Sequence, residues 1–144
     1  MTIRKPLVIG AAGNPAELPS GDTLEGVGGV RVITLGIDGG GGVPTTGVKG
    51  YGICPVAGTL IGWRIVGDVA GSAVVDVYKI AYGSTLPTSS ICAAAKPTLS
   101  SAVTNKDDTL TDWTTAVAEN DIFGFNLDSV SGLTRITVEL LLRL

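Results

Sequence analysis

The sequence has 144 residues, of which 44% are hydrophobic and 16% are charged, with a formal net charge of −3 and no histidine. A chain of this length and apolarity can bury a core of its own, which argues against global disorder and against a fold that depends on metal or disulfides. The lack of histidine removes the commonest general base and the usual catalytic triads, and charges without a basic stripe disfavour nucleic-acid binding.

Glycine is abundant, with 21 residues spread along the chain. Glycines scattered between runs of Val, Ile and Thr are typical of an all-β protein with many tight turns. The charged fraction of 16% is below the roughly 25% usual for soluble domains. We therefore expect part of the surface to be covered by partners, which favours an oligomer or a packed assembly.

Residues 1–29 are predicted to form an extended N-terminal arm, in which Leu7-Val8-Ile9 could add one strand to a sheet. The segment has too few apolar residues for its own core and is rich in loop signals. Such an arm lies on a neighbouring subunit or remains a disordered tail, and the sequence leaves both open. The apolar run ends at Gly10, which is too short for a signal peptide or a membrane span, so we expect neither secretion nor membrane insertion.

From Val30 onward the pattern predicts strands. In the strand expected over residues 60–66, the alternation of apolar and polar residues places Trp63 on the core-facing side. In the strand expected over residues 72–82, Val75 and Val77 are expected in the core and Asp76 on the solvent-facing side. These first four strands are expected over residues 30–37, 48–56, 60–66 and 72–82.

Residues 83–108 are predicted to form a long connection rich in Ser, Thr, Ala and Pro, with room for a short strand at 91–95. Three further strands are expected over residues 109–117, 122–127 and 133–144, the last being the clearest by its alternation. The seven or eight strands and the lack of an amphipathic helix predict an all-β fold. We expect an antiparallel β-sandwich, jelly-roll-like, over residues 30–144.

Few groups suit catalysis. We interpret the acidic cluster of Asp107, Asp108 and Asp112 as a solvated loop, with a weak calcium site or the carboxylate pair of a depolymerase as alternatives. The four glycines 39–42 are not followed by the Gly-Lys-Ser/Thr of a phosphate loop, so we interpret them as a flexible strand connection. We expect no catalytic residue, no cofactor and no metal ion.

Three side chains remain ambiguous. Cys54 and Cys92 are interpreted as buried free thiols, although two cysteines could also pair. Trp113 is flanked by Thr and Asp residues, which leaves its placement open between core and surface. An exposed Trp113 would be the candidate contact for a glycan, because an aromatic ring can stack on a sugar.

The opening of the chain, residues 4–10 followed by residues 17–24, resembles the start of many tailed-phage virion proteins. The rest resembles a domain of phage tail and structural proteins, so that the likeness covers nearly the whole chain. The supporting stretches are residues 33–40, 46–50, 74–79, 96–100, 110–114 and 121–129. The resemblance implies a jelly-roll-like sandwich, often trimeric, mounted on a virion and without catalytic residues.

We therefore expect a non-enzymatic phage virion structural protein, made in the host cytoplasm. It would be a capsid decoration or cement protein, or a head-fibre component, that self-associates as a homotrimer and docks on capsid or tail proteins through its arm. The arm residues expected to make this contact are Lys5, Pro6, Leu7, Val8, Ile9, Leu18 and Leu24. The alternative is a tail-fibre or receptor-binding module that recognises a host-surface glycan.

Overall fold

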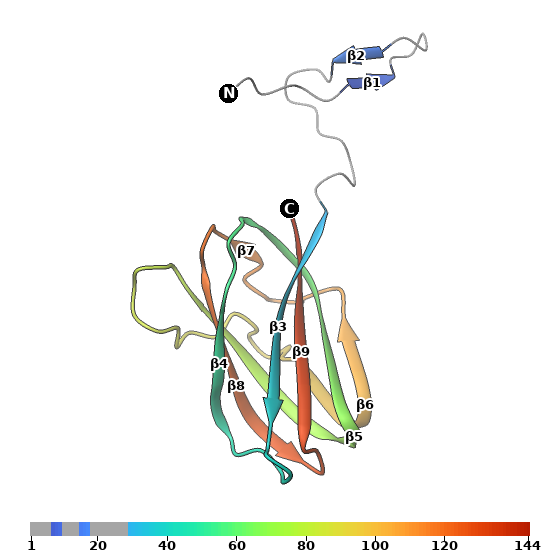
Figure 1. Cartoon of the computed structure of the whole chain (residues 1–144), viewed down its shortest axis with the longest axis vertical. Helices are drawn as coiled ribbons and strands as arrows, with labels where there is room; N and C mark the ends of the chain where they lie inside the picture. Colours follow the sequence, from blue (N-terminus) through green and yellow to red (C-terminus); the bar gives the residue numbers. More distant parts are fainter. Residues whose placement is uncertain (1–6, 10–14, 18–28) are drawn as a thin grey trace.

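The computed structural model describes residues 7–9, 15–17 and 29–144 (Figure 1). These residues form strands and connections without a helix, so none of them provides a helix that could span a membrane. Strands β1 (Leu7–Ile9) and β2 (Pro15–Glu17) make a two-stranded antiparallel sheet. The other strands share a seven-stranded sheet: β3 (Val30–Asp38), β4 (Gly47–Ile53), β5 (Gly58–Ile80), β6 (Thr98–Asp107), β7 (Ala116–Val117), β8 (Ile122–Ser131) and β9 (Arg135–Arg143).

Strand β5 is 23 residues long, and its two halves pair with different strands. Residues 59–67 pair with β9, whereas residues 72–80 pair with β8. Strand β6 follows the same bend, because residues 104–107 pair with the first half of β5 and residues 98–102 with the second half. The sheet is therefore folded into two layers that are continuous through β5 and β6.

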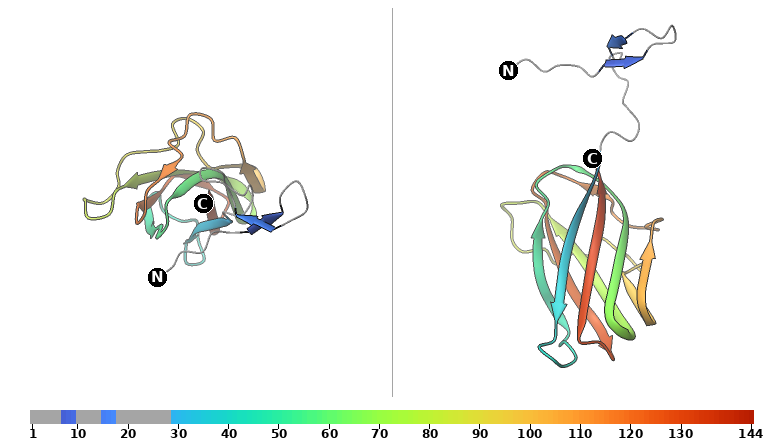
Figure 2. Two further views of the ribbon diagram at one scale, coloured as in Figure 1. Left: turned by 90° about the horizontal axis from the view of Figure 1, so that it is seen from above. Right: turned by 45° about the vertical axis from the view of Figure 1, so that its right-hand side comes forward.

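The first layer, which we call the β3 layer, has the order β3, β9, first half of β5, second half of β6. The second, the β4 layer, has the order β4, β8, second half of β5, first half of β6. The right-hand view of Figure 2 shows β3, β9 and β5 side by side. All pairings are antiparallel, and two such antiparallel layers packed face to face make a β-sandwich. The prediction of an antiparallel, jelly-roll-like sandwich is confirmed.

The core lies between the two layers and takes alternate residues from each strand, as the period of two requires. Trp63, Val75 and Val77 are buried as predicted. Strand β5 contributes six buried apolar residues along its length, and the last two strands of the sheet contribute seven. These are Phe123, Phe125 and Leu127 of β8 and Ile136, Val138, Leu140 and Leu142 of β9, each at most 1% exposed.

The side chain of Leu133 packs into the inside of the β5 bend. Leu133, in the turn between β8 and β9, is completely buried against two glycines of the bend. A Cβ atom on Gly67 would lie 2.5 Å from Leu133 Cδ2, and one on Gly71 would lie 2.6 Å from Leu133 Cγ. Both distances are shorter than van der Waals contact, so any larger residue at either position would force Leu133 out of the corner.

Three predicted segments differ from the structure. The two strands predicted over residues 60–66 and 72–82 are a single bent strand, β5. The connection predicted over residues 83–108 contains β6, and the short strand expected at 91–95 is reduced to a bridge between Ser90 and Tyr78. The strand predicted over residues 109–117 is wrong except for β7. Leu110 and Asp112 have positive φ angles of 50° and 62°, which a strand does not allow.

Candidate functional site

The outer face of the β4 layer is covered by residues 81–97. Asp76, which was predicted to face water, is buried with 5% of its surface exposed, because this segment folds over it. Ser90 Oγ donates a hydrogen bond to Asp76 Oδ1 at 2.5 Å. Lys96 Nζ lies 2.8 Å from Asp76 Oδ2 and 2.7 Å from Asp128 Oδ2. Asp76 can be buried because a later segment of the chain supplies partners for its carboxylate.

Lys96, at the end of this segment, is held in its charged form. Hydrogen bonds to the carboxylates of Asp128 and Asp76 raise the pKa of the Lys96 ammonium, so it stays protonated over the physiological range. Pro87 is buried farther along the face, and a Cβ on Gly124 would lie 3.0 Å from Pro87 Cγ. The part of this face around Asp76 and Gly124 is therefore covered by the chain itself, whereas β4 at its edge stays exposed.

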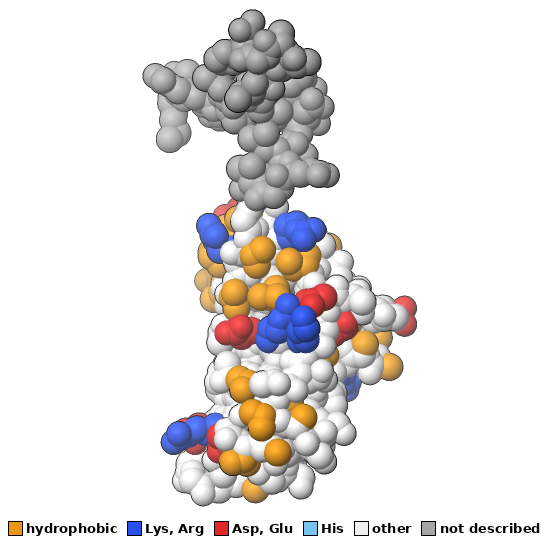
Figure 3. Space-filling view, turned by 90° about the vertical axis from the view of Figure 1, so that its right-hand side faces the viewer, with side chains coloured by type: hydrophobic (Ala, Val, Ile, Leu, Met, Phe, Trp, Pro, Cys, Tyr) orange, Lys and Arg blue, Asp and Glu red, His pale blue; other side chains and the backbone are white. Residues whose placement is uncertain are grey.

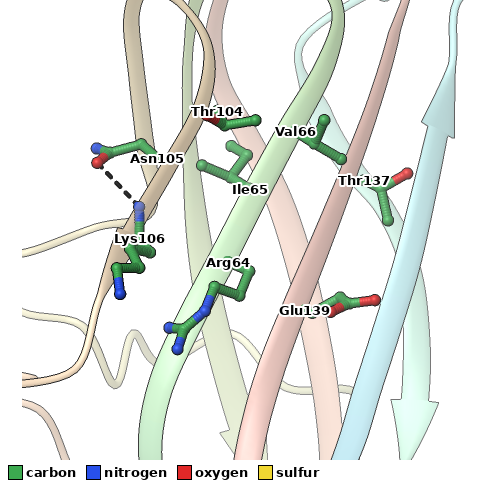
Figure 4. A pocket seen from close by; sticks show the side chains of 8 residues that line it. All are labelled: Arg64, Ile65, Val66, Thr104, Asn105, Lys106, Thr137 and Glu139. Carbon is green, nitrogen blue, oxygen red and sulfur yellow. Dashed lines mark hydrogen bonds between the residues drawn. The ribbon is translucent and has the colours of Figure 1, made fainter.

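The outer face of the β3 layer carries an open groove of about 510 Å³, which we call the charged groove. It is lined by Arg64, Ile65, Val66, Thr104, Asn105, Lys106, Thr137 and Glu139. Figure 4 shows Lys106 and Arg64 on one side and Thr137 and Glu139 on the other. In Figure 3, seen from the side of β5 and β6, charged side chains gather at mid-height between apolar ones above and below.

Ion pairs neutralise one side of the charged groove. Asp108 Oδ1 lies 2.7 Å from Arg64 Nη1, and Asp108 Oδ2 lies 3.4 Å from Lys106 Nζ. The hydrogen bond from Arg64, followed by its charge and by the contact with Lys106, lowers the pKa of Asp108. Glu139 is the register partner of Arg64 across the strands and makes no ion pair with another described residue. The groove therefore presents both donors and a carboxylate acceptor to solvent.

A second open surface runs along the edge strands of the two layers. Val30 and Val32 on β3 and Val48, Tyr51 and Ile53 on β4 are 44–54% exposed, and we call these five residues the β3–β4 surface. A shallow groove of about 320 Å³ lies between residues 31–34 and residues 52–56.

Glycines bring the two edge strands together. A Cβ on Gly50 would lie 2.9 Å from Leu35 Cδ1, and one on Gly52 would lie 3.3 Å from Ile33 Cγ2. Side chains of β3 therefore pack directly on the backbone of β4. Leu35 and Ile33 lie on the inner side of β3, whereas Val30 and Val32 point outward from it. Of the five residues of the β3–β4 surface, Val32 and Ile53 line the same shallow groove.

Trp113 is buried, with 8% of its surface exposed, and its Nε1 donates a hydrogen bond to the carbonyl oxygen of Ala95 at 2.8 Å. The turns around Leu110 and Asp112 direct the ring into the core cluster instead of along a strand. Trp113 therefore does not present a ring face on which a sugar could stack. It is also not among the residues that line the charged groove.

The acidic cluster is built into local structure. Asp107 Oδ1 accepts hydrogen bonds from the backbone N–H and the hydroxyl of Thr109, and its Oδ2 accepts one from the N–H of Leu110. These bonds lower the pKa of Asp107. Asp108 pairs with Arg64 and lines a separate groove together with Thr109 and Leu110. Within residues 29–144 and the two short N-terminal strands, no group of acidic or sulfur ligands is arranged to hold a metal.

Both cysteines are free and buried, as interpreted from the sequence. Burial raises the pKa of the Cys92 thiol to about 12, so this thiol stays protonated and unreactive at neutral pH. Of the predicted arm contacts, Leu7, Val8 and Ile9 form β1. The other four, Lys5, Pro6, Leu18 and Leu24, lie outside the described residues.

Comparison with known proteins gives no relative: no family model matches the chain, and neither a curated protein nor a solved structure matches it. The two open surfaces and the arm are therefore the features from which a function can be inferred. Sequence reasoning missed both surfaces, although the outward positions of Arg64 and Glu139 within their predicted strands were a usable signal.

Proposed function

We propose that the chain is a non-enzymatic structural protein of a bacteriophage particle, a capsid decoration or head-fibre component. It self-associates as a trimer and docks on the particle through its N-terminal arm. The observation that supports this best is the β3–β4 surface, where five large apolar side chains on the two edge strands are 44–54% exposed. Two of them, Val32 and Ile53, line one groove, and exposed apolar side chains gathered in this way are typical of an interface with another protein.

Two further observations support the proposal. The jelly roll serves in viral capsid domains, which is an analogy of fold alone. The charged fraction of 16% leaves a surface poor in the charges that keep monomers apart. Both are expected of a protein whose faces are covered in an assembly.

Immunogold electron microscopy of purified particles, with an antibody to this chain, tests the proposal. Label on the particle is the expected result, and its position separates capsid decoration from a fibre. Absence of label, with an accessible antigen and the protein present in infected cells, contradicts the proposal. For the arm, deletion of residues 1–24 is expected to leave a folded domain that no longer attaches, and attachment of the truncated chain contradicts the docking role.

The charged groove favours a second candidate function, a tail-fibre or receptor-binding module that recognises a host-surface glycan. Its volume of about 510 Å³ is in the range of small-molecule sites. The groove combines donors on Arg64, Asn105 and Lys106 with the carboxylate of Glu139, which suits a ligand rich in hydroxyl groups. Jelly rolls also occur in lectin domains, again by analogy of fold.

A glycan array probed with the full chain tests this candidate. Thr104→Trp fills the charged groove without removing an ion pair, so it should abolish any signal. Thr45→Trp, at an exposed position in the β3–β4 connection, is the matched control and should bind as the wild type does. A folded wild-type chain that gives no signal above background counts against the glycan role.

A further inference from the structure

Strand β3 has no partner on its outer side among the described residues. It pairs with β9 alone, in continuous register and without a bulge. Sheets normally protect such an edge with charges, proline, a bulge or a short strand. Between Arg31 and Asp38, β3 has none of these features, whereas β4 carries Lys49 and a bulge between Val48 and Gly50. The β3 edge is therefore free to accept another strand.

The hydrogen bonds at the two ends of the β3–β9 ladder show which backbone groups face this edge. Leu144 N donates to Gly29 O at 3.3 Å, and Gly39 N donates to Thr134 O at 2.8 Å. Bonded positions alternate along an antiparallel ladder, so the odd-numbered residues of β3 bond to β9. The N–H and C=O groups that point to the open edge are those of the even-numbered residues, Val32, Thr34 and Gly36 among them.

Strands β1 and β2 also have unpaired edges. Among the described residues they pair with each other alone, from Leu7 opposite Glu17 to Ile9 opposite Pro15, and form a sheet separate from the larger one. A two-stranded sheet by itself is only marginally stable in water, because a third strand or a covering surface is needed to bury its apolar side chains. This pair therefore gains stability wherever it finds an edge to join.

The position of β1 and β2 in the chain brings them within reach of such an edge. Residues 18–28 connect β2 to Gly29, which immediately precedes β3. A connection of that length can span at most about 40 Å. The N-terminal strands of one copy can therefore extend to the β3 edge of an adjacent copy.

We propose that the open edge of β3 in one copy accepts the β1–β2 pair of a second copy as added strands. Main-chain hydrogen bonds to the outward groups of β3 would join the two sheets. The two sheets are not paired with each other among the residues that the structure describes. Every copy carries both the open edge of β3 and the β1–β2 pair, so a second copy can supply the partner. Donor and acceptor lie at different places on the molecule, so the contact is head-to-tail and can close into a ring such as a trimer.

This inference rests on the self-association in the proposed function and names its surface. The first test is the mass of the full chain in solution, measured by light scattering after gel filtration. The wild type is expected at a multiple of 14.6 kDa. Thr34→Pro removes an N–H at the open edge without breaking a bond to β9, so it should shift the mass to that of the monomer. Thr34→Val keeps the N–H and should remain oligomeric.

A wild type that is monomeric at the highest concentration reached would overturn the inference, as would a Thr34→Pro chain of unchanged mass. A second measurement covers a Thr34→Pro chain that fails to fold. Copies carrying Val8→Cys are mixed with copies carrying Thr34→Cys and treated with a short bifunctional maleimide, to which the buried Cys54 and Cys92 should not react. A covalent dimer that requires both variants is expected, and its absence contradicts strand addition between copies.

The two proposals fail separately. Unlabelled particles with an oligomeric, cross-linkable chain would contradict the virion role and support the strand addition. Labelled particles with a monomeric chain that does not cross-link would support the virion role and contradict the strand addition.

Discussion

The β4 layer is covered on its outer face by residues 81–97, whereas the β3 layer leaves its outer face to solvent. In sequence the two faces look alike, because each shows polar residues at alternate positions of a strand. Asp76 nevertheless lies in a buried ion-pair network with Lys96, while Arg64 lines an open groove. The comparison teaches that an outward polar side chain is structural or available for binding according to what folds over it later in the chain.

The two layers share one core, so the largest effect should come from a residue that serves both. Phe125→Ala removes a fully buried ring, and we expect a loss of about 3–5 kcal/mol in the free energy of unfolding. Val66→Ala, on the open outer face, should change it by less than about 0.5 kcal/mol. Urea denaturation measures both variants, and similar losses for the two would contradict the assignment of core and surface.

A matched pair of lysines separates the covered face from the open one. Lys96→Met leaves the buried carboxylate of Asp76 without its cation, and we expect a loss of about 1–3 kcal/mol. Lys106→Met removes an exposed ion pair of 3.4 Å and should change stability by less than about 0.5 kcal/mol. Equal effects, measured by thermal unfolding at neutral pH, would show that residues 81–97 do not close the face.

A smaller effect is expected at the corner where the layers meet. The hydroxyl and backbone N–H of Thr134 bond to Asp68 and lower the pKa of this carboxyl from 3.8 to about 2. Because the folded-state pKa is lowered, the contribution to stability is present above pH 3.8 and is lost as the pH falls towards 2.

Carbon NMR titration of Asp68 checks this pKa. Thr134→Val removes the hydroxyl and should raise the pKa towards 3.8, with Thr137→Val as a control that leaves it unchanged. A wild-type Asp68 that titrates near 3.8 would mean that the bonds to Thr134 do not persist in solution.

The alternation of apolar and polar residues was enough to predict most of the strands. The strand predicted at residues 133–144 is β9, and Leu141, the exception in its pattern, is half-buried on the outer face. Strand β6 escaped prediction because it runs along the sheet edge with mostly exposed polar residues, so no apolar face marks it. The position of the bend of β5 was predicted as the break between the strands at residues 60–66 and 72–82, but the continuity of one strand through it was not. The packing of Gly67 and Gly71 against Leu133, which joins distant parts of the chain, leaves no local signal for that continuity.

The charged groove was beyond sequence reasoning for a related reason. Arg64, Lys106 and Glu139 come from three strands, and only the pairing register places them together. Local patterns indicate which way each side chain points along its own strand. They carry no information on which residue lies beside it, so the candidate site could not be assembled without the structure.

The position of β9 has a consequence for synthesis of the protein. β9 comes after β3 and β5 in the chain, yet it lies between them in the β3 layer. On the ribosome, β3 must therefore wait for residues 135–143 before it gains its partner in the sheet. A nascent chain that pauses before this point exposes both sides of an unprotected strand, which favours association with other nascent chains. We expect the β3 layer to form only after these residues have emerged.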